Sequence, residues 1–250
     1  MADRQRVVAI VQARMASTRL PGKAMLPIAG KPMLELVLDR VGRSKMIDEV
    51  VVATSTEKGD DVIADYCGSR ACRFSRGSEE DVLSRYRDAA VAFDADIVVR
   101  ITSDCPLMDP TVLDLVVSRF LEVLPAVDYA ANTLPPRTFP RGLDVEVFSI
   151  GALERAFVED QDPRSREHVT PYIYRHPEIF ELLRVPHVPD LSEHRWTVDT
   201  PEDLALVRAV YDDFEGQEFS YVDVVAFLQR SPLITGLNSR IVQKELKESP

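Results

Sequence analysis

The chain has 250 residues, 45% of them hydrophobic, and a formal net charge of −11 at pH 7. This length suits one large α/β domain, or one domain with a small appendage. The acidic balance argues against a general nucleic-acid or membrane-surface binder, because phosphate groups would repel the protein outside local basic patches. No apolar run approaches the roughly 18 residues of a membrane-spanning helix, and the N-terminus lacks a signal-peptide core, so we expect a cytoplasmic protein.

The first motif along the chain is an apolar strand followed by a cationic loop. Residues 7–11 (VVAIV) are mostly β-branched, which predicts a strand buried on both faces. Residues 12–23 then hold three cations, two hydroxyl side chains and a Pro-Gly pair, and residues 33–41 return to helical periodicity. Ligands of open α/β sheets bind beyond the carboxyl ends of the strands, so the loop is predicted to bind a polyphosphate. The alternative is a solvated surface loop.

Two common phosphate-binding motifs do not fit this loop. A Walker loop needs G-x-x-x-x-G-K-[ST], but Ser17 stands at the first glycine position and Ala24 follows Lys23. A dinucleotide fingerprint needs glycines directly after the strand, and residues 12–15 contain none. We therefore predict a different nucleotide-binding loop, with these contributors: Gln12, Ala13, Arg14, Ser17, Arg19, Gly22 and Lys23.

The rest of the first half alternates strands with helices. Strands are predicted at residues 50–54 (VVVAT), 72–75 (CRFS) and 97–101 (IVVRI). Helices are predicted after the first of these strands, from Ser78, and from Pro110 to Leu121; the pattern Ser78 to Asp81 is typical of a capping box. Repeated strand-helix units of this kind predict an α/β fold with a doubly wound, mostly parallel sheet.

The second half departs from this alternation. Residues 129–140 are rich in prolines and turn residues, so we expect residues 129–190 to form an insertion for sugar binding or dimerisation within a main domain of residues 1–232. Residues 143–148 alternate strictly, which predicts a half-exposed strand with Asp144 and Glu146 on one face.

Further elements are predicted toward the C-terminus. Short strands are expected at residues 179–185 and 195–198, and Arg166 and His168 are expected near a helix start. Thr200, Pro201 and Asp203 carry the signature of a capped helix N-terminus. One amphipathic helix is expected from Ser220, and residues 233–250 are expected to form a solvated tail.

Two aspartates stand where a metal ion could bind. Asp104 follows a buried strand in TSDCP, and Asp199 precedes the capped helix in RWTVDTPED. Mg²⁺ is usually held by one or two carboxylates, with phosphates and water completing an octahedron. The alternative for both residues is a loop or helix-capping aspartate. Ser103, beside Asp104, is assigned to the nucleotide.

The loop QARMASTRLPGKAMLPIAGKP resembles the signature of the SpsF-like spore-coat polysaccharide biosynthesis family, within the acylneuraminate and KDO cytidylyltransferases. The blocks RGSEEDVLSRYRDAA, PRGLDVEVFS, SREHVTPYIY and WTVDTPEDL look like segments of the same family. This resemblance implies a nucleotide-diphospho-sugar transferase (GT-A-like) fold, Mg²⁺ as the cofactor and a homodimer. It also implies that Arg14 and Lys23 hold the triphosphate during catalysis, while Asp104 and Asp199 bind magnesium.

The remaining candidate residues are polar side chains at strand ends and in the second half. Arg76 and Ser78 lie where the third strand meets a helix N-terminus, a natural anion site, and are assigned to the nucleotide. Arginine matches carboxylates and phosphates bidentately, and glutamate accepts bonds from hydroxyls. The acceptor is therefore assigned to Arg100, Arg141, Glu146, Arg166 and His168. The alternative is surface salt bridges.

The leading hypothesis is magnesium-dependent nucleotidyl transfer from a nucleoside triphosphate, CTP by the resemblance, to a sugar or sugar acid in surface polysaccharide synthesis, with release of pyrophosphate. The oxygen of the acceptor attacks the α-phosphate, so no protein nucleophile is needed. Two alternatives stay open: a nucleotide-sugar-dependent glycosyltransferase, which would require a D-x-D-like metal site, and a non-catalytic nucleotide-sugar-binding subunit. No nucleic-acid or membrane partner is expected.

Overall fold

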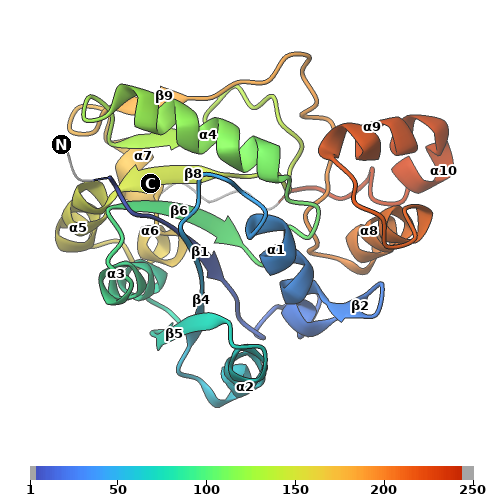
Figure 1. The fold of residues 1–250 in the computed structure, drawn as a ribbon, viewed down its shortest axis with the longest axis horizontal. Helices are drawn as coiled ribbons and strands as arrows, with labels where there is room; N and C mark the ends of the chain where they lie inside the picture. Colours follow the sequence, from blue (N-terminus) through green and yellow to red (C-terminus); the bar gives the residue numbers. More distant parts are fainter. Residues whose placement is uncertain (1–3, 244–250) are drawn as a thin grey trace.

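The computed structural model describes residues 4–243 of the chain. Its centre is one sheet, to which this part of the chain contributes seven strands (Figure 1). Their order across the sheet is β5 (Arg73–Gly77), β4 (Glu49–Ser55), β1 (Val7–Gln12), β6 (Ile97–Thr102), β8 (Glu146–Ser149), β7 (Tyr129–Ala131) and β9 (Leu182–Arg184). Only β8 runs antiparallel to its neighbours, so the prediction of a mostly parallel sheet is confirmed.

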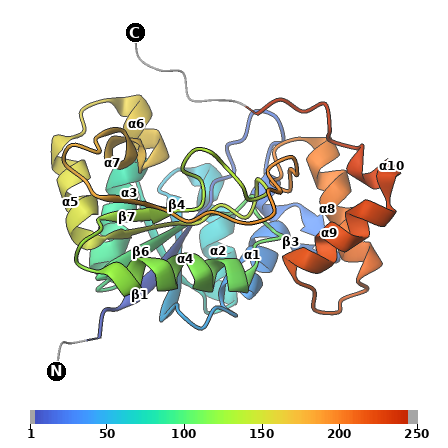
Figure 2. The same ribbon diagram turned by 90° about the horizontal axis from the view of Figure 1, so that it is seen from above.

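Helices cover both faces of this sheet and one of its ends (Figures 1 and 2). One face packs against α1 (Met33–Val41), α2 (Asp61–Ser69) and α4 (Pro110–Val123). The other packs against α3 (Val82–Ala92), α5 (Ile150–Glu159), α6 (Pro163–His168) and α7 (Pro171–Arg175). A third group, α8 (Pro201–Asp213), α9 (Tyr221–Arg230) and α10 (Pro232–Thr235), lies together at one end. The sheet therefore separates two apolar cores.

The position of β1 decides where a ligand can bind. Residues 7–11 are at most 2% exposed, as expected for a strand with helices on both faces. From β1 the chain builds β4 and β5 on one side and then crosses to β6 on the other. This reversal is a topological switch point, where open α/β sheets bind ligands beyond the carboxyl ends of the strands. The loop after β1 includes η1 (Lys23–Met25) and the small hairpin of β2 (Pro27–Ile28) and β3 (Lys31–Pro32).

The predicted strands of the second half needed correction. The turn-rich segment contains the buried strand β7, which the sequence pattern did not predict. Strand β8 is buried on both faces instead of half exposed, because Glu146 points into the interior and forms an ion pair with Arg100. The strand expected at residues 195–198 is absent from the described chain, which has only a single parallel bridge between Arg141 and Arg195 there. Residues 129–190 contribute three strands to the central sheet.

Two helix starts also differ from the prediction. The N-cap of α3 is Asp81, whose carboxylate accepts from the backbone N–H of Ser84 at 3.0 Å, while the Ser78 hydroxyl accepts from the N–H of Asp81. Arg166 and His168 lie in the last turn of α6 and not at a helix start. Helix α2 is preceded by η2 (Lys58–Asp60).

The start of α8 is confirmed. Thr200 is its N-cap: its hydroxyl accepts from the backbone N–H of Asp203, and its own backbone N–H donates to the Asp203 carboxylate, which completes a capping box.

The segment after α10 packs against the domain. Asn238 is 5% exposed, and its amide donates to the backbone oxygen of Arg195 and to the carboxylate of Asp203. The prediction of a solvated tail is therefore wrong at this residue, and the charged residues 244–250 lie outside the described part of the chain. Among residues 4–243, no helix is long and apolar enough to cross a bilayer.

Candidate active site

Lys23 joins two aspartates at the carboxyl edge of the sheet. Its Nζ donates to Asp104 Oδ2 at 2.7 Å, to Asp199 Oδ1 at 2.8 Å and to the backbone oxygen of Val198 at 3.0 Å. The three charged side chains are only 15%, 22% and 17% exposed, respectively. Asp104 and Asp199, which follow Lys23 by 81 and 176 positions in the sequence, thus share its ammonium group.

The charges of this cluster support one another. Burial disfavours the ammonium of Lys23, but the carboxylates of Asp104 and Asp199 outweigh that effect and raise its pKa. Burial likewise disfavours the carboxylate of Asp104, yet the Lys23 charge and hydrogen bonds from Lys23 and Thr102 lower its pKa overall. Lys23 and Asp104 are therefore both charged at neutral pH.

A turn stabilised by Asp60 and Gly22 delivers Lys23 to this position. Asp60 is 3% exposed and accepts hydrogen bonds from the N–H of Met15 at 2.7 Å and from the hydroxyl of Ser55 at 2.6 Å. The N–H of Gly22 then donates to the oxygen of Met15, which closes the loop on itself. Gly22 has φ +69°, a left-handed conformation that glycine adopts without steric cost.

A second layer of charges holds Asp199. Its Oδ2 atom accepts from Arg19 at 3.0 Å and from Arg195 at 2.9 Å, which leaves Oδ1 for Lys23. Asp203, fully buried, binds Arg195 at 2.9 and 3.1 Å and accepts from the N–H groups of Asp199 and Thr200 at 3.0 Å each. Arg195 fixes the orientation of the Asp199 carboxylate, a role that sequence reasoning missed because this segment has no regular period.

Asp104 is fixed from the opposite side. The Thr102 hydroxyl donates to its Oδ1 atom at 2.5 Å, so Oδ2 faces Lys23. Its backbone oxygen accepts from the N–H of Val198 at 2.8 Å, which ties the end of β6 to the segment that carries Asp199. The two carboxylates are thus aligned by the backbone as well as by Lys23.

Other predicted nucleotide residues surround this edge through their backbone. The N–H of Ala13 donates to the oxygen of Ala53, and the N–H of Ser103 donates to the oxygen of Gln12, so both residues extend the strand ends. Ser17 is half-buried in the loop.

Arg14 points toward α6. Its guanidinium forms an ion pair with Glu167 at 3.2 Å, and both side chains are about two-fifths exposed, at 40% and 44%. Together they line a hollow of about 480 Å³. Its other lining residues are Glu79, Glu80, Pro163 and Arg164. Arg14 therefore borders an open, mixed-charge surface.

Two of the predicted arginines, Arg76 and Arg166, are held by contacts within the fold. Arg76 donates to the backbone oxygens of Ser55 and Glu57 and pairs with Asp61 at 2.8 Å. Its position between β4 and α2 is explained by these contacts.

Arg166 joins three elements. It donates to the backbone oxygens of Phe157 and Asp160 and binds Asp81 at 2.7 Å, so it connects α5, α6 and the N-cap of α3. Arg141 contributes its backbone, which accepts from the N–H of Trp196 at 2.6 Å. The structure does not bring Arg76 or Arg166 to the Lys23 cluster.

A second polar cluster lies on the α3–α7 face. Arg100 pairs with Glu146, which also accepts from the hydroxyls of Tyr129, at 2.8 Å, and Thr170. Arg100 is paired with Ile10 of β1. Gln12 follows Ile10 by two residues, so the side chains of Gln12 and Arg100 lie on the same face of the sheet. Within the described chain, Gln12 Oε1 and Arg100 Nε are buried and have no hydrogen-bond partner.

His168 borders this cluster across a strained turn. Burial lowers the pKa of its imidazole, and the nearby charges of Arg100 and Arg14 lower it further, so the ring is neutral at pH 7. The next residue, Val169, is fully buried with φ +73° and ψ −58°, and the N–H of Thr170 donates to the His168 oxygen at 2.9 Å. This γ-turn is rare and costly for a β-branched residue. The turn places His168 near Arg14 of the loop after β1, and it lets the Thr170 hydroxyl donate to Glu146.

The donor set of the Lys23 cluster fits magnesium. Asp104 and Asp199 direct one carboxylate oxygen each at a single cation, as a Mg²⁺ site with phosphate and water ligands requires. Within residues 4–243, no group of three or more His, Cys, Asp or Glu side chains could hold a metal ion. The protein would therefore supply two ligands, and the substrate would supply others.

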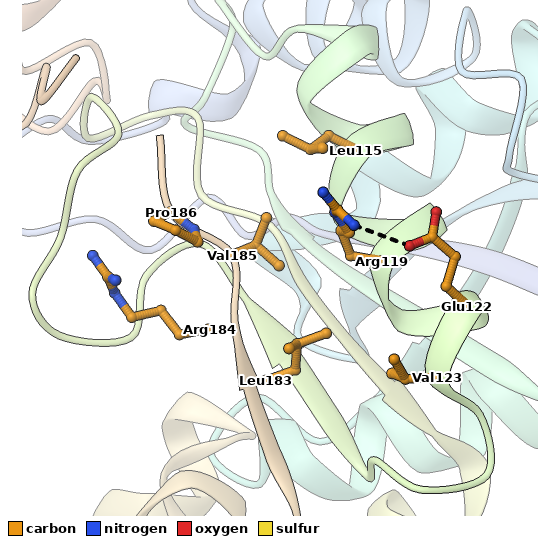
Figure 3. A pocket seen from close by; sticks show the side chains of 8 residues that line it. All are labelled: Leu115, Arg119, Glu122, Val123, Leu183, Arg184, Val185 and Pro186. Carbon is orange, nitrogen blue, oxygen red and sulfur yellow. Dashed lines mark hydrogen bonds and ion pairs between the residues drawn. The ribbon is translucent and has the colours of Figure 1, made fainter. Parts of the chain in front are cut away.

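A separate hollow of about 330 Å³ lies between α4 and β9, the strand at one edge of the sheet (Figure 3). Its apolar lining is Leu115, Val123, Leu183, Val185 and Pro186. Its charged lining is the Arg119–Glu122 ion pair and Arg184, which donates to the backbone oxygen of Pro136. It contains none of the residues assigned to the nucleotide from the sequence, and it is separate from the Lys23 cluster.

Comparison with known proteins agrees with this architecture. Residues 8–223 match the family described as Cytidylyltransferase. The chain belongs to this family and is a cytidylyltransferase-like enzyme. It is 36% identical to a solved cytidylyltransferase structure from Leptospira borgpetersenii, with a TM-score of 0.89 over 97% of this chain and all of that one. The nucleotide-sugar transferase-like fold is thereby confirmed.

Curated relatives include a spore coat polysaccharide biosynthesis protein, SpsF, of Bacillus subtilis, 32% identical over 90% of this chain and 95% of that protein. An uncharacterized protein of Methanocaldococcus jannaschii is 34% identical over 97% of this chain and 98% of its own. A 3-deoxy-manno-octulosonate cytidylyltransferase of Pelobacter propionicus is 34% identical, over 46% of this chain and 45% of its own. The predicted resemblance is confirmed.

Proposed function

We propose that this enzyme transfers a cytidylyl group from CTP to a sugar or sugar acid and releases pyrophosphate, with Mg²⁺ bound by Asp104 and Asp199. The observation that carries the proposal is the convergence of Lys23, Asp104 and Asp199 at the switch point of the sheet. CTP as the donor is supported by membership of the cytidylyltransferase family. The acceptor class is supported by relatives named as a spore coat polysaccharide biosynthesis protein and as a 3-deoxy-manno-octulosonate cytidylyltransferase. A cytoplasmic location and a homodimer stay predictions.

In this mechanism the loop after β1 binds the triphosphate. Lys23 and Arg14 neutralise negative charge that builds on the phosphate oxygens as the acceptor oxygen attacks the α-phosphate and pyrophosphate departs. Arg19 lies on the same loop, beside Asp199, and is suited to the outer phosphates. Backbone N–H groups of the loop add neutral donors.

A divalent cation between the two carboxylates would supply further charge neutralisation on the phosphates. The protein holds the ligands in place: Thr102 orients Asp104, while Arg195 and Asp203 orient Asp199. Such prior alignment reduces the reorganisation needed during the reaction.

The acceptor is proposed to bind near His168, Arg100 and Gln12. Arg100 and Glu146 neutralise each other, so this surface suits hydroxyl groups, whereas Arg14 at its rim suits a carboxylate or phosphate. The unpaired Gln12 and Arg100 atoms support a polar ligand here.

The decisive test is Lys23→Ala, assayed by pyrophosphate release with CTP, Mg²⁺ and a panel of acidic and phosphorylated sugars. We expect turnover to fall by at least about a hundredfold, because the variant loses a charge that stabilises the transition state. Lys31→Ala, on the exposed hairpin, is the control and should keep full activity. Full activity of a folded Lys23→Ala variant would remove this mechanism.

Differential scanning fluorimetry tests the choice of nucleotide. Each nucleoside triphosphate is added with and without Mg²⁺, and we expect CTP to raise the melting temperature most, in a magnesium-dependent way. A ligand at a hundredfold excess over its Kd stabilises the native state by about 2.7 kcal/mol. A larger shift with another triphosphate would contradict CTP as the donor while leaving nucleotidyl transfer in place.

A further inference from the structure

The cations of the nucleotide loop contact the proposed metal ligands directly. Lys23 lies between Asp104 and Asp199, at 2.7 and 2.8 Å, and Arg19 contacts the second oxygen of Asp199 at 3.0 Å. The side chains suited to phosphate are therefore the counter-ions of the carboxylates suited to Mg²⁺. A divalent cation cannot bind both carboxylates while the ammonium lies between them, because like charges at such distances repel strongly.

We propose that Lys23 is an internal counter-ion that blocks divalent metal binding until a triphosphate draws its ammonium away from Asp104 and Asp199. The proposal rests on the proposed function, because it assigns the phosphates to Lys23 and the metal to the two aspartates. Linkage is reciprocal: nucleotide must tighten metal binding by the same factor by which metal tightens nucleotide binding. The complete site therefore forms only when the triphosphate and the metal ion bind together.

The two sides of the ion cluster differ in how firmly they are held. The Asp104 carboxylate accepts from the Thr102 hydroxyl, and its backbone oxygen accepts from the N–H of Val198. The Asp199 carboxylate accepts from Arg195, and its backbone N–H donates to Asp203. Lys23 is held only through its ammonium, at the end of a flexible four-carbon side chain. The lysine can leave while the carboxylates stay in place.

The first experiment measures Mn²⁺ binding to the nucleotide-free protein by electron paramagnetic resonance, for the wild type and for Lys23→Met. We expect Lys23→Met to bind Mn²⁺ at least about tenfold more tightly, a common size for coupling between sites. Asp104→Asn in the Lys23→Met background should abolish the gain, which locates the ion. Equal affinities of the wild type and Lys23→Met would overturn the proposal.

Lys31→Met is the matched control. Lys31 lies on the adjacent hairpin, pairs with Asp39 at 2.7 Å and is 46% exposed, so its removal changes the net charge by the same amount. We expect its Mn²⁺ affinity to equal that of the wild type. A gain as large as that of Lys23→Met would assign the effect to net charge alone and would overturn the proposal.

A second measurement needs no variant, in case Lys23→Met does not fold. The wild-type protein is labelled briefly with acetic anhydride, and modification of Lys23 is quantified by mass spectrometry. Saturating Mn²⁺ without nucleotide should displace the ammonium and raise labelling of Lys23 several-fold, with Lys31 unchanged. Unchanged Lys23 labelling at saturating Mn²⁺ would contradict the displacement.

Calorimetry with CTP separates this proposal from the proposed function. If the wild type binds no CTP with or without Mn²⁺, while Lys23→Met still gains Mn²⁺ affinity, the nucleotide assignment fails and the counter-ion role stands. If the wild type binds CTP, and its Mn²⁺ affinity does not depend on CTP after correction for Mn²⁺ binding to free CTP, the counter-ion role fails and the transferase assignment stands.

Discussion

Asp203 connects helix α8 to the residues that hold Asp199. It is fully buried and accepts from the N–H groups of Asp199 and Thr200, from Asn238 and from both sides of the Arg195 fork. A buried carboxylate is tolerated only when it is paired and fully hydrogen-bonded. Asp203 therefore couples the stability of α8 to the position of Asp199.

Replacement of Arg195 by methionine should be strongly destabilising. It leaves Asp203 buried without its cationic partner, and breaking a buried pair from one side costs about 3–5 kcal/mol. We expect the free energy of unfolding, measured by urea denaturation, to fall by roughly 3 kcal/mol or more.

The control for this change is Arg208→Met. Arg208 is half-buried and donates to the backbone oxygen of Pro27, with no carboxylate partner among the described residues, so we expect a loss within about 1 kcal/mol. A similar loss in both variants would refute the special role of the Arg195–Asp203 pair.

At the level of elements, the two irregular segments around Arg141 and Arg195 are held side by side by Gly142. This glycine has φ +103°, and a Cβ there would lie 2.6 Å from the nitrogen of Thr197 and 2.7 Å from the carbonyl carbon of Trp196. Those atoms belong to the backbone that leads to Asp199, so they cannot move aside cheaply. The close approach explains why this position is a glycine.

Gly142→Ala should therefore lower both stability and activity. The strained φ and the backbone clash together are expected to cost about 2–4 kcal/mol, measured by thermal or urea unfolding. The control is Gly68→Ala in α2, where nothing lies within 4 Å of the added Cβ; it should be neutral or stabilising by up to about 1 kcal/mol. A Gly142→Ala protein as stable as the wild type would mean that the two segments can separate.

The elements that were predictable from the sequence are those buried on both faces by regular neighbours. Residues 7–11 are a continuous apolar run and residues 97–101 are apolar except for Arg100, and both are central strands of the sheet. The three residues of β7 are too few to give a pattern and lie before a proline-rich stretch. In β8 the charged Glu146 resembled a solvent-facing position, because its buried partner Arg100 lies 46 residues away.

The site was predictable in part for the same reason. Lys23 and Asp104 each follow a predicted strand, so the sequence predicts a common sheet edge, and in the structure Lys23 contacts both Asp104 and Asp199. The support from Arg195 and Asp60 could not be predicted, since it joins irregular segments that have no period. The individual roles of these residues stay predictions.

At the scale of the whole molecule, stability should depend on pH through Glu35 of α1. Burial raises the pKa of this carboxyl, but hydrogen bonds from Tyr66 and Arg70, and the charge of Lys31, outweigh it and lower the pKa to about 2. A lowered pKa in the folded state stabilises the protein above the ordinary value near 4.5. That contribution disappears as the pH falls from 4.5 toward 2.

Glu35→Gln measures this contribution. Arg70 and Lys31 are about half exposed, at 54% and 46%, so solvent screening limits the effect to about 1 kcal/mol at pH 7. We expect the difference in unfolding free energy between wild type and variant to be largest at pH 7 and to shrink toward zero as the pH falls from 4.5 through 2. A difference that does not change with pH would exclude the carboxylate charge as its source.

The ion cluster at Lys23 also has a consequence for folding kinetics. Its contacts join residues separated by 81 and 176 positions, so they close very long loops of chain and depend on a sheet that is already assembled. Local helices and hairpins can form without it, whereas a partly folded chain cannot present Asp104 and Asp199 together. Recovery of the proposed metal binding during refolding would therefore mark the last step, when the two halves of the chain have met.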